Sequence, residues 1–240
     1  MKKTYTILLT LVLLGFNTQH AFAQFVVAQD TIRGSIDFCQ RAGDMRNAVA
    51  VPNDSVFYMF PPDLDIDPWR YVHYYTPARD VEIGYIKGTK LMRVDDYDIV
   101  EVERLSPSTN TITFRNNDVR IVVTVGNLAT KNSPVKRSAD GKYTINGKEV
   151  KGATQWVSPK TQYKSITVSM NGRNITFPKR VFEHLLEPDI EDMVIYHNPK
   201  KKTVYIQANN GGLDAFYTVL WTVTPHGVSN PYIFDPALKR

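Results

Sequence analysis

Apolar and polar residues alternate through most of the chain between positions 81 and 223. A period of two places successive side chains on opposite faces of a strand, which predicts half-buried strands at residues 111–114, 119–125 and 203–206. Residues 216–223 are apolar on both faces, as is typical of a strand covered on both sides. We therefore expect a mainly β protein with antiparallel sheets, forming one or two β-sandwich-like units with one or two short helices.

Two Asn-Gly pairs predict tight hairpins, because this dipeptide readily adopts the positive φ angles of a type I′ turn. Asn146-Gly147 joins one pair of short alternating segments, and Asn171-Gly172 joins another. A third hairpin is expected between residues 194–196 and 203–206, through a longer turn.

Helical spacing is restricted to two short segments. Pro178 can begin a helix, and Val181, Leu185 and Leu186 then lie on one side before Pro188 ends it, which predicts a helix over residues 178–187. A weaker helical pattern covers residues 35–50.

The first 23 residues have the pattern of a secretory signal peptide. Lys2 and Lys3 precede a run of about twelve mostly apolar residues, and Ala21-Phe22-Ala23 provides the small residues of a cleavage site before Gln24. No later run is apolar enough to cross a bilayer. The sequence thus predicts an exported protein that is periplasmic, cell-surface or secreted, with no transmembrane segment after signal cleavage.

The mature chain carries little net charge. Removing residues 1–23 removes two lysines and no acid, which leaves 27 basic and 24 acidic residues and a net charge of +3. The charges are interspersed, so a nucleic-acid partner is not expected.

A polar stretch at residues 129–141 is the best candidate for a linker. It divides the chain into a mainly β unit at residues 24–135 and a second mainly β unit at residues 136–240, which contains the predicted short helix.

Signatures of common enzymes are missing from the sequence. It has no Gly-rich phosphate loop, no Gly-x-Ser-x-Gly elbow and no His-Glu-x-x-His. Its single cysteine, Cys39, is expected to be a buried, inert thiol. These features favour a non-enzymatic protein and assign no catalytic residue.

Three alternating carboxylates form the first candidate site. Asp63, Asp65 and Asp67 would project from one side of an extended segment, as a hard cation such as calcium requires. The alternative, an exposed acidic edge without a metal, is favoured, so no cofactor is expected unless calcium binds here.

An aromatic face is the best candidate for binding. On a strand, Trp69, Tyr71, His73 and Tyr75 share one side, where they can stack on sugar rings or contact a peptide if they are exposed. The alternative is that this face packs against a second sheet. The loop around Asn210 and Asp214 is a second candidate, because loops on a β scaffold often carry binding residues.

The C-terminal quarter resembles a recurrent ending in uncharacterised exported β-proteins of Bacteroidetes bacteria. The segments that carry the resemblance are Ile175-Thr176-Phe177-Pro178, Leu185-Leu186-Glu187-Pro188, Asn210-Gly211-Gly212-Leu213-Asp214 and Tyr217-Thr218-Val219-Leu220-Trp221. The resemblance implies export and a β fold, and it implies no particular activity.

Three hypotheses for function follow. The leading one is a binding or envelope-accessory protein with a glycan or protein partner of the cell envelope. The first alternative is a glycan-acting hydrolase with paired carboxylates drawn from the acidic residues above. The second is a structural component of a surface assembly, which would self-associate.

Overall fold

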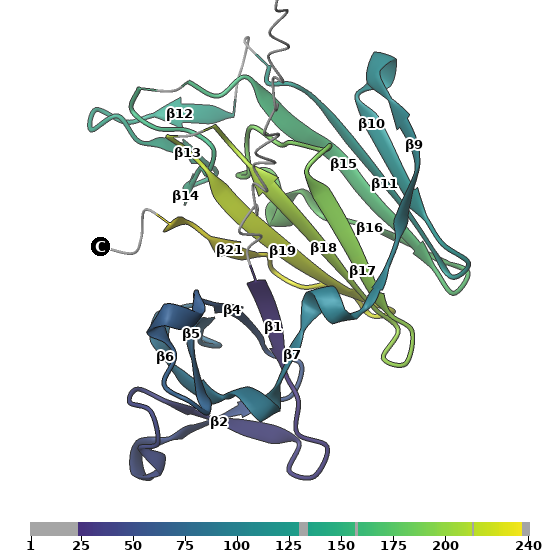
Figure 1. The fold of residues 1–240 in the computed structure, drawn as a ribbon. Helices are drawn as coiled ribbons and strands as arrows, with labels where there is room; N and C mark the ends of the chain where they lie inside the picture. The colour runs from purple at the N-terminus through teal and green to yellow at the C-terminus, as the bar shows by residue number, and fades with distance from the viewer. Residues whose placement is uncertain (1–23, 130–133, 157, 213, 237–240) are drawn as a thin grey trace, which may run out of the picture.

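The computed structural model describes residues 24–129, 134–156, 158–212 and 214–236. Within these residues every regular element is a β-strand or a single 3-10 turn, and all strand pairs are antiparallel except one isolated bridge (Figure 1). The predicted fold class, mainly β and sandwich-like, is confirmed. The predicted signal peptide, residues 1–23, lies outside the described residues. No helix in the described part of the chain has the length and apolar character needed to cross a membrane.

A seven-stranded sheet forms the N-terminal unit. Its strands follow the order β3-β2-β6-β5-β4-β1-β7, and the sheet curls around an apolar core that includes Ile36, Phe57 and Val72. The bounds are β1 (Gln24–Ala28), β2 (Ser35–Cys39), β3 (Val49–Pro52), β4 (Val56–Met59), β5 (Trp69–Tyr75), β6 (Val81–Lys87) and β7 (Leu91–Arg93). Cys39 is fully buried, as predicted.

The remaining large sheets form a β-sandwich. One has five strands in the order β16-β15-β11-β10-β9, and the other runs β20-β19-β18-β17-β8, with β21 also paired to β19. Trp221 is fully buried between them, and its Nε1 donates to the Val181 carbonyl at 2.9 Å. The bounds are β8 (Asp98–Ile99), β9 (Glu101–Ser106), β10 (Thr111–Arg115), β11 (Val119–Asn127), β15 (Thr161–Met170), β16 (Arg173–Thr176), β17 (Met193–Asn198), β18 (Thr203–Asn210), β19 (Tyr217–Thr224), β20 (Gly227–Val228) and β21 (Tyr232–Phe234).

The sandwich extends across the predicted boundary between residues 24–135 and 136–240. β11 pairs with β15 along its whole length, although the two strands lie on opposite sides of that boundary. Between them, a small sheet of β12 (Val135–Arg137), β13 (Tyr143–Ile145) and β14 (Lys148–Glu149) is an insertion on the sandwich. The chain instead passes from the N-terminal sheet to the sandwich through the 3-10 turn η4 (Val94–Asp96).

The three predicted hairpins are present. Asn146 and Gly147 have φ values of 51° and 79°, and Asn171 and Gly172 have 52° and 72°, as a type I′ turn requires. The third hairpin joins β17 and β18, with Asn198 opposite Thr203.

Neither predicted helix forms. Over residues 178–187 the only helical element is the 3-10 turn η6 (Lys179–Val181), and Leu185 and Leu186 make isolated bridges to Lys151 and Gln162. The apolar residues of this segment are buried, but they reach the core from an irregular loop. Residues 35–50 form β2, the 3-10 turn η1 (Met45–Asn47) and part of β3, because Ile36 and Phe38 alternate with a polar residue and enter the core of the sheet.

The two units share an apolar cluster. Phe25 and Phe60 of the N-terminal unit pack with Leu220, Tyr232 and Phe234 of the sandwich. The strand β21, which lies on the side of the sandwich facing the N-terminal sheet, contributes two of these residues (Figure 1). The last described strand of the chain therefore joins the two units.

Candidate binding site on the aromatic face

Tyr71, His73 and Tyr75 of β5 project on one side of the sheet, as the sequence predicted. In the antiparallel pair β5–β6, Tyr71 lies opposite Tyr85, His73 opposite Ile83, and Tyr75 opposite Val81. Directly opposed residues project on the same side of a sheet. The intervening Val72 and Tyr74 project to the other side, into the core of the N-terminal unit.

One half of this face is covered by β21. His73 is only 6% exposed, and its Nδ1 lies 2.6 Å from the Tyr232 hydroxyl. That hydroxyl donates its proton to the His73 carbonyl, so Nδ1 carries the hydrogen that joins it to Tyr232. The Tyr75 hydroxyl donates to the Ile233 carbonyl at 2.9 Å. His73 and Tyr75, which the sequence suggested as binding residues, therefore attach the N-terminal unit to the sandwich.

Burial determines the charge of His73. Removal from water lowers its pKa from 6.5 to about 4, so the imidazole is neutral at pH 7. A neutral imidazole packed edge-on against Tyr75 and Tyr232 belongs to the apolar contact between the units.

The other half of the face is open to solvent. Val81 is 51% and Ile83 40% exposed, while Trp69, Tyr71 and Tyr85 are half-buried. The rings of Tyr71 and Tyr85 lie with their centroids 4.9 Å apart. We call these five residues, Trp69, Tyr71, Val81, Ile83 and Tyr85, the open aromatic face.

An unpaired strand edge borders the open aromatic face. β2 pairs with β6 only at Tyr85 and Ile86, so in the described part of the chain the first half of β6 has no partner on that side. Gly84 permits the close crossing, because a Cβ there would lie 2.4 Å from the Cys39 carbonyl oxygen. The backbone of residues 81–83 is therefore available beside exposed apolar side chains.

The three carboxylates of the acidic segment, Asp63, Asp65 and Asp67, have different surroundings. Asp65 accepts a hydrogen bond from the Tyr71 backbone N–H at 2.8 Å, and both Asp65 and Asp67 form ion pairs with Arg70. Asp63 lies exposed in the 3-10 turn η2 (Pro62–Leu64). Among the residues that the structure describes, no three His, Cys, Asp or Glu side chains are grouped to hold a metal ion. The segment instead anchors the beginning of β5.

The two loop residues proposed from the sequence have different environments. Asn210 is 1% exposed, and its Oδ1 accepts from the Tyr163 hydroxyl at 2.9 Å and from the Asp189 N–H at 3.1 Å. Asn210 is thus part of the core and is not accessible to a ligand. Asp214 is exposed in the turn before β19.

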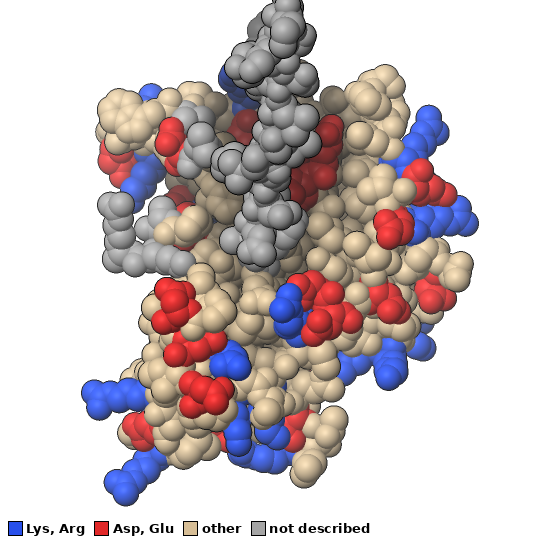
Figure 2. Space-filling view, viewed as in Figure 1, with Lys and Arg blue, Asp and Glu red and all other residues tan. Residues whose placement is uncertain are grey.

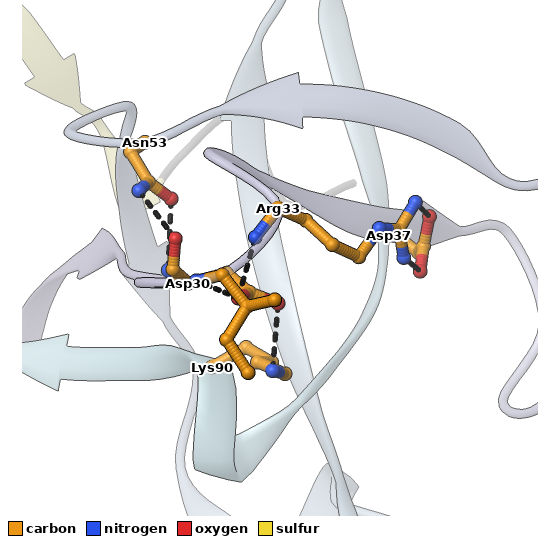
Figure 3. A network of polar contacts seen from close by, with 6 residues as sticks. Asp30, Arg33, Asp37, Asn53 and Lys90 are labelled. Atoms are coloured by element: carbon orange, nitrogen blue, oxygen red, sulfur yellow. Dashed lines mark hydrogen bonds and ion pairs between the residues drawn. The ribbon is translucent and has the colours of Figure 1, made fainter.

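Sequence reasoning missed a polar network around Asp30 (Figure 3). The Asp30 side chain is 4% exposed and accepts from the Lys90 ammonium at 2.7 Å and from the N–H groups of Ile32 and Arg33. Asn53 binds both the N–H and the C=O of Asp30. The Lys90 contact and these N–H donors hold the pKa of the Asp30 carboxyl well below its usual range. With these partners in place, the network fastens the β1–β2 turn to its neighbours and offers no obvious ligand position.

Two recesses lie at the junction of the units. One, of about 300 Å³, is lined by Tyr97, His197 and Lys201 among others, and Lys201 also lines a second, of about 640 Å³. Lys201 forms an ion pair with Asp54 at 2.5 Å, across the two units. Lys201 is the middle residue of three consecutive lysines at positions 200–202, and it therefore has a partner within the chain.

No protein-family model, curated protein or solved structure matches this chain. The resemblance to exported Bacteroidetes proteins therefore stays a prediction.

Proposed function

We propose that this chain is an exported binding or envelope-accessory protein that holds an extended segment of a protein partner on its open aromatic face. The observation that carries the proposal is the exposure of Val81 and Ile83 beside Tyr71 and Tyr85, on the first half of β6, which has no strand partner on its outer side among the described residues. Export is part of the proposal and rests on the sequence of residues 1–23.

The chemistry of the face favours a peptide over a sugar. An extended peptide can add to an unpaired strand edge through backbone hydrogen bonds, and alternate side chains then contact the neighbouring face. Here those neighbours are aliphatic and aromatic, so the expected partner segment alternates apolar and polar residues. A sugar would use the rings of Trp69, Tyr71 and Tyr85, but it would leave Val81 and Ile83 without apolar partners.

The test uses selection from a random peptide display library, with a glycan array in parallel, on the mature chain of residues 24–240. The informative variant is Ile83→Glu, which places a charge on the open aromatic face. The matched control is Ile32→Glu, since Ile32 is 92% exposed in the β1–β2 turn, away from this face. Circular dichroism verifies that both variants fold.

We expect selected peptides to bind the wild type and the Ile32→Glu control with equal affinity. Their affinity for Ile83→Glu should be lower by a factor of about ten or more. Equal affinity for both variants would place the binding elsewhere on the molecule. Binding to sugars alone would replace the peptide with a glycan as the partner of this site.

A further inference from the structure

The strand β9 is an exposed edge of the sandwich. It is the terminal strand of the five-stranded sheet, and in the described residues no strand pairs with its outer side (Figure 1). Five of its six residues are exposed and the sixth is half-buried. An exposed edge with free backbone groups is a template for pairing with another strand.

Apolar side chains on this edge face the open end of the sandwich. Val102 lies opposite the buried Phe114, and Leu105 opposite the buried Ile112, so both project on the core side of the sheet. Nevertheless Val102 is 51% and Leu105 39% exposed. Ile99, in the adjoining strand of the facing sheet, is 52% exposed. The core is therefore incompletely covered along β9.

Opposite charges lie side by side at the centre of β9. Glu103 and Arg104 meet the β10 strand at a bulge, and Glu103 contacts Arg115 at 3.0 Å and Arg120 at 3.7 Å on the outer face. Arg104 has no ion-pair partner among the described residues. Figure 2 shows acidic and basic side chains interspersed along the margin of the molecule where Figure 1 places β9.

We propose that two copies of this chain associate through antiparallel pairing of their β9 strands. The two-fold axis passes between Glu103 and Arg104. Glu103 then lies opposite Arg104 of the partner subunit, and Val102 lies opposite Leu105 of the partner subunit. The same contacts are repeated by symmetry, so the interface is closed and isologous.

The charges select this register over its neighbours. A shift by one residue in one direction places Glu103 against Glu103 of the partner subunit and Val102 against Arg104 of the partner subunit. A shift in the other direction places Arg104 against Arg104 of the partner subunit. Like charges directly opposite each other destabilise a strand pair, and a shift also separates the apolar residues. Only the central register satisfies both the charges and the apolar side chains, which is why a second copy fits this edge.

This inference does not depend on the proposed function, because β9 lies in the sandwich and the open aromatic face lies on the N-terminal sheet. The first test is sedimentation equilibrium of the mature chain over a range of concentrations. We expect a monomer–dimer equilibrium, and we expect Arg104→Glu to weaken the dimer about tenfold, because both symmetric pairs become like-charged. The matched control, Arg173→Glu, changes an exposed arginine at the opposite edge of the same sheet and should leave the equilibrium unchanged.

Cysteine cross-linking tests the register. Val102→Cys and Leu105→Cys are prepared as separate proteins, each with the buried Cys39 in place, and are oxidised alone and as a mixture. The mixture should give more disulfide-linked dimer than either protein alone, because only the mixture places the two thiols opposite each other. A monomer at every concentration would overturn the proposal. So would a dimer that Arg104→Glu leaves intact, or equal cross-linking in the three samples.

Discussion

Lowering the pH from 7 to about 4.5 should destabilise the fold through three buried histidines, His73, His184 and His197, because burial lowers the pKa of each. His73 is 6% and His184 7% exposed, and for both of them burial is the main cause that lowers the pKa from 6.5 to about 4. Between these two values the unfolded chain binds protons that the folded chain does not. Stability is therefore fully present above about pH 6.5, falls as the pH drops through this window, and stops falling on account of these groups near pH 4.

The size of the effect follows from the pKa difference. One pKa unit corresponds to about 1.4 kcal/mol, so the full difference would be worth about 3 kcal/mol for each of His73 and His184. Residual hydration reduces this, and we expect about 2 kcal/mol for each. The carboxyl of Asp30 acts in a lower window: its depressed pKa gives stability that is lost only as the pH falls below about 4. Measurements above that pH isolate the histidines.

Urea unfolding at several pH values between about 7 and 4.5 measures this loss as a fall in the free energy of unfolding. The variant His73→Gln removes one of the three titrating groups, so the slope of stability against pH should become shallower without vanishing, whatever the variant's stability at pH 7. His226→Gln is the control, since His226 is exposed and lies outside the inter-unit cluster. A wild-type curve that is flat over this range, or a His73→Gln slope equal to that of the wild type, would refute the reasoning.

Three further results are expected. Tyr232→Phe removes a hydroxyl that binds both the imidazole and the carbonyl of His73, and should lower the free energy of unfolding by about 2 kcal/mol in a urea titration at pH 7. Gly152→Ala would place a Cβ 2.2 Å from the Leu186 carbonyl oxygen, and it should lower the free energy of unfolding by about 3 kcal/mol or more in the same titration. Gly147→Ala is the control: it also has a positive φ, but its Cβ would meet no atom within 4 Å, so it should lower the free energy of unfolding by about 1 kcal/mol. Excess calcium should leave the midpoint of thermal unfolding of the wild type unchanged. A rise of several degrees would indicate that calcium binds the folded protein, with the acidic segment as the candidate site.

Local signals in the sequence were sufficient for β11 and for the two Asn-Gly hairpins, but not for β2 and β3, which the sequence predicted as helical. Asn146-Gly147 and Asn171-Gly172 determine their turns through backbone angles that few other dipeptides adopt, so no distant residue is needed to predict them. The alternation along β11 likewise identifies its faces, and every second residue from Val119 to Val123 is buried. These features depend on neighbours in the chain, and they were predicted from the chain alone.

Features that depend on tertiary contacts were not predicted. The spacing of Val181, Leu185 and Leu186 fits a helix, but backbone bridges to Lys151 and Gln162 hold the two leucines in an irregular loop. The pairing of β11 with β15 bypasses the inserted small sheet, which the sequence shows only as a polar stretch. Asp30 gave no functional signal because its main charged partner, Lys90, lies 60 positions away in the chain.

The aromatic face of β5 depends both on a local sequence pattern and on tertiary contacts. Alternation along β5 correctly places Tyr71, His73 and Tyr75 on one side, because the period of a strand is a local property. The hydrogen bonds depend on β21, a segment about 160 residues later: Tyr232 contacts the ring of buried His73, and the Ile233 carbonyl accepts from Tyr75, which is half-buried like Tyr71. One alternating pattern therefore provides both an attachment between the units and an open surface beside it. The binding hypothesis is therefore restricted to the part of the face around Val81 and Ile83, whose side chains are exposed.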